Sequence, residues 1–112
     1  MKRIGGNITA ELQVKSTVKN AIGESVPSWT TKYSLKGFLD YQSGDSKYTN
    51  QYTKMEESTH VFLCDYQPLD VEAEESRMII NGKRYDIMLI DNPMELNMHM
   101  EIYLKYVGAQ DA

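Results

Sequence analysis

The sequence of 112 residues has almost no cysteine and no long apolar run. Cys64 is the only cysteine, so no disulfide can form within the chain, and a lone thiol is typical of an intracellular protein. No apolar stretch is long enough to span a bilayer, and the first residues lack the apolar run of a signal peptide. We therefore expect a soluble protein that is not exported and has no membrane contact.

Residue groups typical of catalysis or of cofactor binding are also missing. His60 and Cys64 lie on one predicted strand, where about 3.3 Å per residue separates them by roughly 13 Å, too far for a dyad or a shared metal. His99 could approach from another strand, but no feature of the sequence requires it. Residues 72–76 lack the spacing of a calcium loop, and no glycine pattern opens a phosphate-binding helix. We expect a protein that is not an enzyme and that holds neither cofactor nor metal, with Cys64 as a packing residue.

Charge is distributed unevenly along the chain. Residues 1–54 carry eight Lys or Arg and four Asp or Glu, whereas residues 55–76 carry seven acidic residues and no Lys or Arg. A net charge of −4 argues against a protein whose main task is to grip nucleic acid, because phosphate binding needs a basic face. The two regions offer complementary surfaces for a head-to-tail neighbour, and simple surface variation is the alternative. The acids that could face a partner are Glu72, Glu74 and Glu75.

Alternation of apolar and polar side chains predicts β-strands along most of the chain. A first strand precedes residues 20–28, which contain Gly and Pro and form a turn or an exposed loop. A second strand begins at Trp29, with Gly37 as a candidate bulge or close-approach point. Residues 59–66 form a third, nearly continuous apolar strand. The apolar positions of the first strand are Leu12, Val14 and Val18, and those sharing one face of the second are Tyr33, Leu35, Leu39 and Tyr41.

A hairpin centred on Asn81-Gly82 gives the clearest structural signal. An Asn-Gly loop of two residues favours a type I′ turn. The resulting register places Ile80 opposite Lys83, Ile79 opposite Arg84, Met78 opposite Tyr85 and Arg77 opposite Asp86. The expected inward side chains are Met78, Ile80, Tyr85, Ile87 and Leu89, with Arg77 and Asp86 paired in solvent. Asn81 and Gly82 thus fix the register that puts Tyr85 and Ile87 into the core.

The last strand completes a meander with this hairpin. Its predicted inward side chains are Met98, Met100, Ile102, Leu104 and Tyr106, and its predicted outward ones are His99, Glu101, Tyr103 and Lys105. Between the second and third strands, residues 43–58 form a long polar loop, which is either functional or a floppy insertion. Residues 67–76 form an acidic connection or hold one turn of helix.

Five or six antiparallel strands with one buried face each must close on themselves or be covered, because open edges invite aggregation. The sequence therefore predicts an all-β fold, a small antiparallel β-barrel of five to six strands with one long polar loop. We expect a single domain over residues 1–112, with flexible ends at residues 1–6 and 108–112.

Two motifs and the order of the elements carry a resemblance to a known family. Ser43-Gly44-Asp45 opens the long loop, and the hairpin residues 82–87 read Gly-x-x-Tyr-x-Ile. With the acidic link and the amphipathic last strand, this order resembles the head-tail joining, or head-closure, proteins of long-tailed bacteriophages and prophages. The resemblance covers about residues 25–107. Where many members carry an Arg-Tyr pair after the central strand, this chain has Cys64-Asp65-Tyr66.

The resemblance implies a structural virion protein of the head-tail connector. Copies of the chain would form a ring, expected to be a dodecamer, below the portal and its adaptor, with a tail protein beneath. Such a ring closes the DNA-filled head, lets packaged DNA pass through it and provides the surface for tail attachment; it assembles in the bacterial cytoplasm. The loop residues expected at an interface or at the channel are Gly44, Asp45, Lys47, Tyr48, Tyr52 and Lys54.

Two other functions are open from the sequence. A minor tail or tail-completion protein would also be small, rich in strands and ring-forming. A nucleic-acid-binding β-barrel would show exposed aromatic residues interleaved with Lys or Arg on one strand face, whereas Tyr33 and Tyr41 share the row of Leu35 and Leu39.

Overall fold

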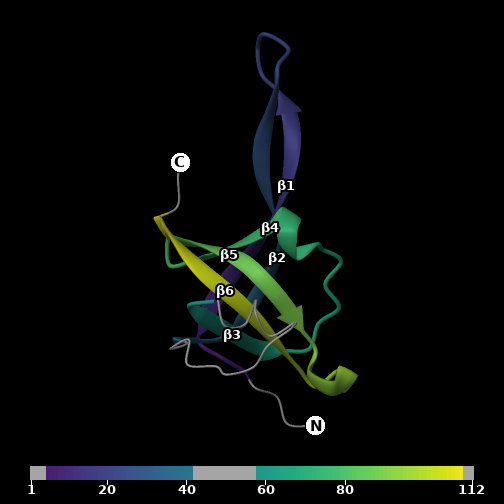
Figure 1. Cartoon of the computed structure of the whole chain (residues 1–112), viewed down its shortest axis with the longest axis vertical. Helices are drawn as coiled ribbons and strands as arrows, with labels where there is room; N and C mark the ends of the chain where they lie inside the picture. The colour runs from purple at the N-terminus through teal and green to yellow at the C-terminus, as the bar shows by residue number, and fades with distance from the viewer. Residues whose placement is uncertain (1–4, 42–57, 110–112) are drawn as a thin grey trace.

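The computed structural model describes residues 5–41 and 58–109. Six strands and two single-turn 3₁₀ helices follow one another along these residues (Figure 1). The strands are β1 (Ile8–Lys19), β2 (Ser25–Tyr41), β3 (His60–Asp65), β4 (Ser76–Ile80), β5 (Lys83–Asp91) and β6 (His99–Ala109). The 3₁₀ helices are η1 (Ala73–Glu75), within the acidic link, and η2 (Pro93–Glu95). In the described part of the chain, no helix has the length and apolar character needed to cross a membrane.

All six strands belong to one antiparallel sheet that closes on itself in the order β1-β2-β3-β6-β5-β4. Pairing of β1 with β4, from Ala10 opposite Ile80 to Val14 opposite Ser76, completes the ring of strands. Closure satisfies backbone groups that would otherwise be left on free edges. The predicted all-β fold, a small antiparallel barrel, is confirmed.

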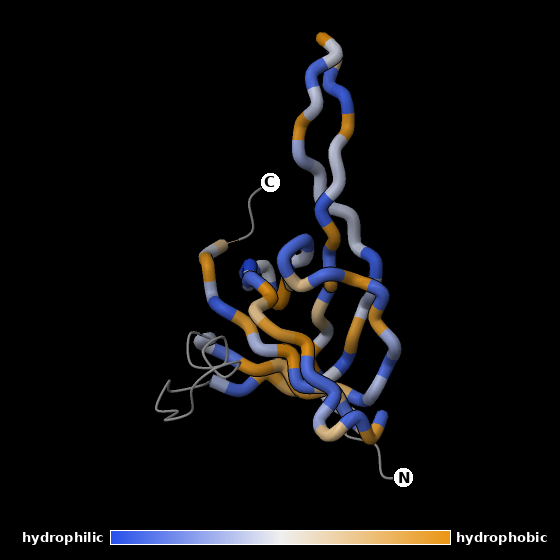
Figure 2. Tube along the Cα trace, turned by 45° about the vertical axis from the view of Figure 1, so that its right-hand side comes forward, coloured by the Kyte–Doolittle hydropathy of each residue, from blue (hydrophilic) through white to orange (hydrophobic). Residues whose placement is uncertain are grey.

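The core lies inside the closed sheet and receives side chains from all six strands. Figure 2 shows the hydrophobic stretches gathered in the strands of the barrel. Burying one aliphatic or aromatic side chain stabilises the fold by about 1.5–3 kcal/mol, so these alternating positions drive closure. The largest fully buried side chains are Phe62, Leu12, Met78, Ile80, Ile102, Leu104 and Cys64.

The β4–β5 hairpin has the predicted register, from Arg77 opposite Asp86 to Ile80 opposite Lys83. Asn81 has φ 52° and Gly82 has φ 74°, the pair of positive values that a type I′ turn requires. Met78, Ile80, Tyr85 and Ile87 are buried in the core, as expected. Asn81 and Gly82 therefore do place Tyr85 and Ile87 inside the barrel.

Two side chains of this hairpin lie elsewhere than predicted. Arg77 is buried rather than in solvent, because its side chain contacts residues at the outer face of β1 and β2. Leu89 does not reach the core, because the register of β5 with β6 shifts between Ile87 and Leu89. After this bulge Ile90 packs against the core in its place.

The last strand alternates as predicted only in its middle. Met100, Ile102 and Leu104 are buried inside the barrel. Met98 is exposed because it precedes the strand, in the turn after η2. Tyr106 is also exposed, at the end of the barrel beyond a second register shift, where its ring meets the edge of Tyr85.

A two-stranded arm projects from the barrel (Figure 1). We define the arm as residues 15–29, where β1 and β2 continue to pair with each other beyond the β1–β4 contacts. The prediction of a turn or loop over residues 20–28 was too long, because β2 already begins at Ser25 and includes Pro27. Val18 is 49% exposed because this part of β1 lies in the arm, beyond the core.

The turn at the tip of the arm spans residues 20–24. The Asn20 side-chain oxygen accepts hydrogen bonds from the backbone N–H groups of Ile22 and Glu24, at 3.1 and 3.0 Å. An Asn that bonds its own following backbone stabilises a turn. The arm thus ends in an ordered turn, with Ile22 79% exposed at its tip.

Gly37 is the predicted close-approach point of β2. A Cβ at this position would overlap the carbonyl oxygen of Leu63 on β3. Tyr41, predicted on the buried row with Leu35, is 77% exposed because it lies at the end of β2 beyond the core. Of the four residues predicted on this row, Leu35 is buried, and Tyr33 and Leu39 are half-buried.

Candidate functional site

The surroundings of Cys64 and His60 are those of packing residues in the barrel. Cys64 is buried in the core, and burial, followed by the neighbouring charge of Asp65, raises the pKa of its thiol to about 11, which disfavours the nucleophilic thiolate. His60 Nδ1 lies 2.8 Å from the Thr59 hydroxyl, and burial lowers the pKa of its ring. Within residues 5–41 and 58–109, no three His, Cys, Asp or Glu side chains are grouped so that they could hold a metal ion.

The residues predicted for the long loop, Gly44, Asp45, Lys47, Tyr48, Tyr52 and Lys54, lie outside the described residues. The two strand ends that border this segment lie next to each other. Tyr41, at the end of β2, pairs with His60 at the start of β3, and their rings meet edge to face at 5.5 Å. The chain therefore leaves and re-enters the barrel at one point.

A series of aromatic contacts stabilises the place where β2 ends and β3 begins. The ring of His60 meets Tyr85 at 5.2 Å, and Tyr85 meets Tyr106 at 5.5 Å, both edge to face. The Thr59 hydroxyl accepts a hydrogen bond from the Tyr106 backbone N–H at 2.8 Å. Such aromatic pairs add about 0.5–1.5 kcal/mol each beyond burial. The base of the loop segment is thus held by β2, β3, β5 and β6.

The predicted partner-facing acids Glu72, Glu74 and Glu75 are exposed on and beside η1. The preceding link is fastened to β2: Lys32 Nζ donates to the Asp70 carbonyl oxygen at 2.7 Å, and the Asp70 N–H donates to the Tyr33 hydroxyl at 3.1 Å. Figure 1 places η1 beside the foot of the arm. The three acids therefore lie on a part of the surface that is held in place by hydrogen bonds. Their contact with a partner stays a prediction.

Arg77 fixes the foot of the arm, the place where the arm joins the barrel. The sequence predicted this side chain in solvent. Arg77 Nε donates to Gln13 Oε1 at 2.8 Å, and Gln13 Nε2 donates to Thr31 Oγ1 at 3.4 Å. The guanidinium of Arg77 also lies over the ring of Trp29. The arm is thus anchored to β4 by a charged group that joins β1 and β2.

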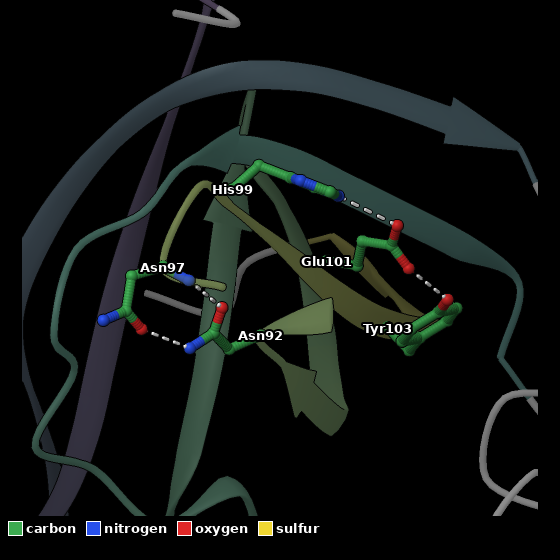
Figure 3. Close-up of polar contacts among 5 residues, drawn as sticks. All are labelled: Asn92, Asn97, His99, Glu101 and Tyr103. Atoms are coloured by element: carbon green, nitrogen blue, oxygen red, sulfur yellow. Dashed lines mark hydrogen bonds and ion pairs between the residues drawn. The ribbon is translucent and has the colours of Figure 1, made fainter. Parts of the chain in front are cut away.

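A polar row runs along the outer face of β6 (Figure 3). Glu101 lies between two partners: His99 Nε2 is 3.1 Å from Glu101 Oε2, and the Tyr103 hydroxyl donates to Glu101 Oε1 at 2.7 Å. Burial and this hydrogen bond raise the pKa of Tyr103. The outward direction of these side chains was predicted correctly, but the burial of Tyr103 was not.

The turn that precedes β6 holds three apolar side chains in solvent. Asn92 Nδ2 donates to Asn97 Oδ1 at 2.7 Å, and the Asn97 N–H donates to Asn92 Oδ1 at 3.1 Å (Figure 3). Met94, Glu95 and Asn97 have positive φ, a conformation that costs non-glycine residues energy. The exposed apolar side chains of this turn are Met94, Leu96 and Met98.

Two of the solved structures similar to this chain show its fold over nearly the whole length. A protein of Shigella flexneri 2a, known from a solution structure, aligns with a TM-score of 0.65 at 14% identity and covers 95% of this chain and 96% of its own. A chain of the virion of a native gene transfer agent particle aligns with a TM-score of 0.57 at 14% identity, over 92% of this chain and 96% of its own. No curated protein sequence gives a significant match.

Sequence similarity defines the family. The model of the phage head completion protein family matches residues 1–105. The chain therefore belongs to this family and is a structural protein of a phage-type virion, as the order of its motifs predicted.

Proposed function

We propose that copies of this chain form a ring in the head-tail connector, below the portal and its adaptor, that closes the DNA-filled head and receives the tail. The match of residues 1–105 to the phage head completion family carries the proposal. The similarity in fold to a chain of a gene transfer agent virion is consistent with such a place in a particle. A dodecamer is the proposed size of the ring.

The described structure supports this role in physical terms. A closed sheet is a rigid subunit, because every strand pairs on both sides in the barrel. Its exposed features are an arm, an acidic link and the base of the long loop, all anchored by specific side-chain contacts. A ring subunit needs surfaces of this kind that differ from one another, because a closed ring is built from heterologous contacts.

The long loop is proposed to act at the channel or at the neighbouring subunit. Tyr48 and Tyr52 are the proposed contact residues, and Lys47 and Lys54 face acidic neighbours or DNA. Because the bordering residues Tyr41 and His60 are held together at the barrel, shortening the segment between them should leave the barrel folded. Replacement of residues 44–53 by a short Gly-Ser link should yield folded protein but heads that lose DNA or fail to join tails.

The test is to assemble virions with and without the gene for this chain. The proposal expects heads that package DNA, remain without tails when the chain is missing, and join tails after purified chain is added. Complete heads that already retain DNA, together with defective tails, would instead identify a tail-completion protein. Normal, infectious particles from a strain carrying the shortened loop would remove the loop from the proposal.

A further inference from the structure

The arm, residues 15–29, has two open strand edges. Within the described residues, β4 pairs with β1 only as far as Val14, and β3 pairs with β2 only from Gly37 onward. Figure 1 shows the arm extending beyond the end of the barrel, with no other strand of the described chain beside it. An open edge presents backbone N–H and C=O groups that can pair with a further strand.

The backbone groups that face the open edges follow from the turn at the tip of the arm. The Asn20 N–H donates to the Glu24 carbonyl oxygen at 2.9 Å, so these two residues form a hydrogen-bonded pair. In an antiparallel ribbon such pairs alternate with pairs whose N–H and C=O groups point away from the partner strand. Pro27, which has no N–H, occupies such an outward position and costs the arm no bond of its own. The outward pairs of the arm are Lys19 with Ser25, Thr17 with Pro27 and Lys15 with Trp29.

The arm has no core of its own, and an added strand would stabilise it. A two-stranded ribbon alone is only marginally stable, and Val18 on its apolar face is exposed. Edge pairing uses backbone groups in the plane of the ribbon, so it requires no match between the faces of the arm. Val18 and Val26 lie on one face, and Lys15 and Lys19 lie on the other. The edges of the arm, rather than its faces, therefore determine which strand fits it.

Pairing of like edges is disfavoured by the residues that face them. Two β1 edges that meet at Thr17 place Lys15 of one copy opposite Lys19 of the other, and like charges directly opposite destabilise a sheet. Two β2 edges that meet at Pro27 place two residues without an N–H opposite each other, so the central pair forms no backbone bond. Lysine and proline protect natural sheet edges from self-pairing in these ways.

The β1 edge and the β2 edge fit each other. In an antiparallel pair centred on Thr17 and Pro27, the Thr17 N–H still donates to the Pro27 carbonyl oxygen, and each lysine meets an uncharged residue. About five backbone hydrogen bonds result, because each outward pair supplies two bonds and Pro27 lacks one donor. The other facing pairs are Lys15 with Trp29 and Lys19 with Ser25.

We propose that β2 of one arm pairs with β1 of the next copy's arm, antiparallel and in the register of the arm itself. The inference rests on the proposed ring of copies and names a contact within it. In a ring all arms point the same way, so each β1 lies beside a neighbouring β2 that runs in the opposite direction. Rotation about the ring axis keeps equivalent residues at the same level, which places Val26 opposite Val18 of the next copy. The arms then form a closed ring of strands without an open edge.

A proline substitution removes one donor from an open edge and leaves the arm's own ladder of hydrogen bonds intact. The N–H of Thr17 faces the open edge, so Thr17→Pro weakens the contact between copies. Thr17→Ala is the matched control, because it changes the same side chain and keeps the N–H. We expect Thr17→Pro to lower the amount of chain in virions about tenfold, because one bond is lost at every contact around the ring. Thr17→Ala should be incorporated at the wild-type level, and both variants should keep the melting temperature of the wild type.

Disulfide formation in virions tests which edges meet. Across the proposed contact the Cα atoms of Val18 and Val26 lie about 4.5 Å apart, within the range that a disulfide spans. The native Cys64 is buried and its thiol has a raised pKa, so it oxidises slowly. Virions are assembled without the wild-type chain from Val18→Cys and Val26→Cys chains together, and are treated with a mild oxidant such as diamide. We expect covalent dimers from this mixture and none from virions that hold either variant alone.

A second mixture tests the register. Ser28 lies diagonally to Val18 of the next copy, at about 7–8 Å, which is too far for a disulfide. Val18→Cys with Ser28→Cys should therefore give far fewer dimers than Val18→Cys with Val26→Cys. Equal yields from the two mixtures would overturn the proposed register.

The outcomes separate this contact from the proposed function. Dimers from Val18→Cys alone or from Val26→Cys alone would show that like edges meet, and would overturn the β1-to-β2 contact. No dimers from the mixture, although both variants are in the virion, would overturn it as well and leave head closure standing. Equal incorporation of Thr17→Pro and Thr17→Ala would also contradict it. Absence of the wild-type chain from intact virions would overturn the proposed function and the contact with it.

Discussion

The guanidinium carbon of Arg77 lies 4.4 Å from the centroid of the Trp29 ring. This contact joins β4 to the foot of the arm, and the hydrogen bond from Arg77 to Gln13 joins the same side chain to β1. A charged residue therefore sets how the arm leaves the barrel. The exposed arm has no core of its own, so its direction depends on this anchor.

Arg77→Ala should lower the free energy of unfolding by about 2–4 kcal/mol, since it removes a hydrogen bond to a charged group and a cation–π contact. Urea unfolding followed by the fluorescence of Trp29, the single tryptophan, measures the change. Lys105→Ala, at an exposed position of β6, is the control and should stay within about 0.5 kcal/mol of wild type. A change no larger than that of the control would mean that Arg77 anchors nothing.

Gly82→Val should lower the free energy of unfolding by about 1–3 kcal/mol, because a β-branched residue resists positive φ. A Cβ at Gly82 would meet no atom within 4 Å, so the cost comes from the backbone and not from a clash. Gly82→Asn is the matched control, because Asn tolerates this conformation. An unchanged melting temperature for Gly82→Val would remove the argument that Asn81-Gly82 fixes the register.

Gly37→Ala tests the close approach of β2 and β3. The added methyl group would overlap the Leu63 carbonyl oxygen, which is backbone and moves only with its strand. We expect a loss of about 1–3 kcal/mol, the usual cost of overpacking, measured by thermal unfolding. Ser34→Ala, on the exposed side of the same strand, should leave the melting temperature unchanged. Equal stability of both variants would show that β3 does not lie this close to Gly37.

Asp91 should make stability depend on pH. Burial first, and the charge of Glu101 second, raise the pKa of Asp91 above its ordinary 3.8, while His99 acts in the opposite direction. A raised folded-state pKa means that folding favours the protonated form of Asp91. The resulting contribution to stability is fully present below the ordinary pKa and is lost as the pH rises through the folded-state pKa. Asp91→Asn should therefore be more stable than wild type at about pH 7 and similar to it at about pH 3.

The measurement for this prediction is urea unfolding at both pH values. Asp40→Asn, at an exposed carboxylate of β2, is the control. If Asp91→Asn stabilises the chain equally at both pH values, protonation of Asp91 is not the cause.

Local signals predicted the fold well. The Asn-Gly turn determined the register of Met78 with Tyr85, because a two-residue turn leaves one pairing free of strain. Alternation identified Met100, Ile102 and Leu104 as core residues. Leu89 was misplaced because a bulge adds one residue between two alternating runs, and alternation alone does not reveal where a bulge occurs.

The surfaces were harder to predict. Whether Val18 is buried depends on where β4 stops pairing with β1, which is a property of strands distant in sequence. Arg77 was expected in solvent because it faces away from the core, yet Trp29 and Gln13 cover it from two other strands. The row of Phe38, Leu63 and Glu101 on the outer face forms only when three strands are aligned, so no single segment such as residues 59–66 signals it.

The most direct test of the account is the amount of DNA that heads retain. Heads assembled without the gene for this chain are divided, incubated with or without the purified chain, and treated with nuclease; the protected DNA is then measured. Head closure predicts that heads lose most of their DNA without the chain and protect a full genome length with it. Full protection without the chain, or no gain when the chain is bound to the heads, would contradict the account.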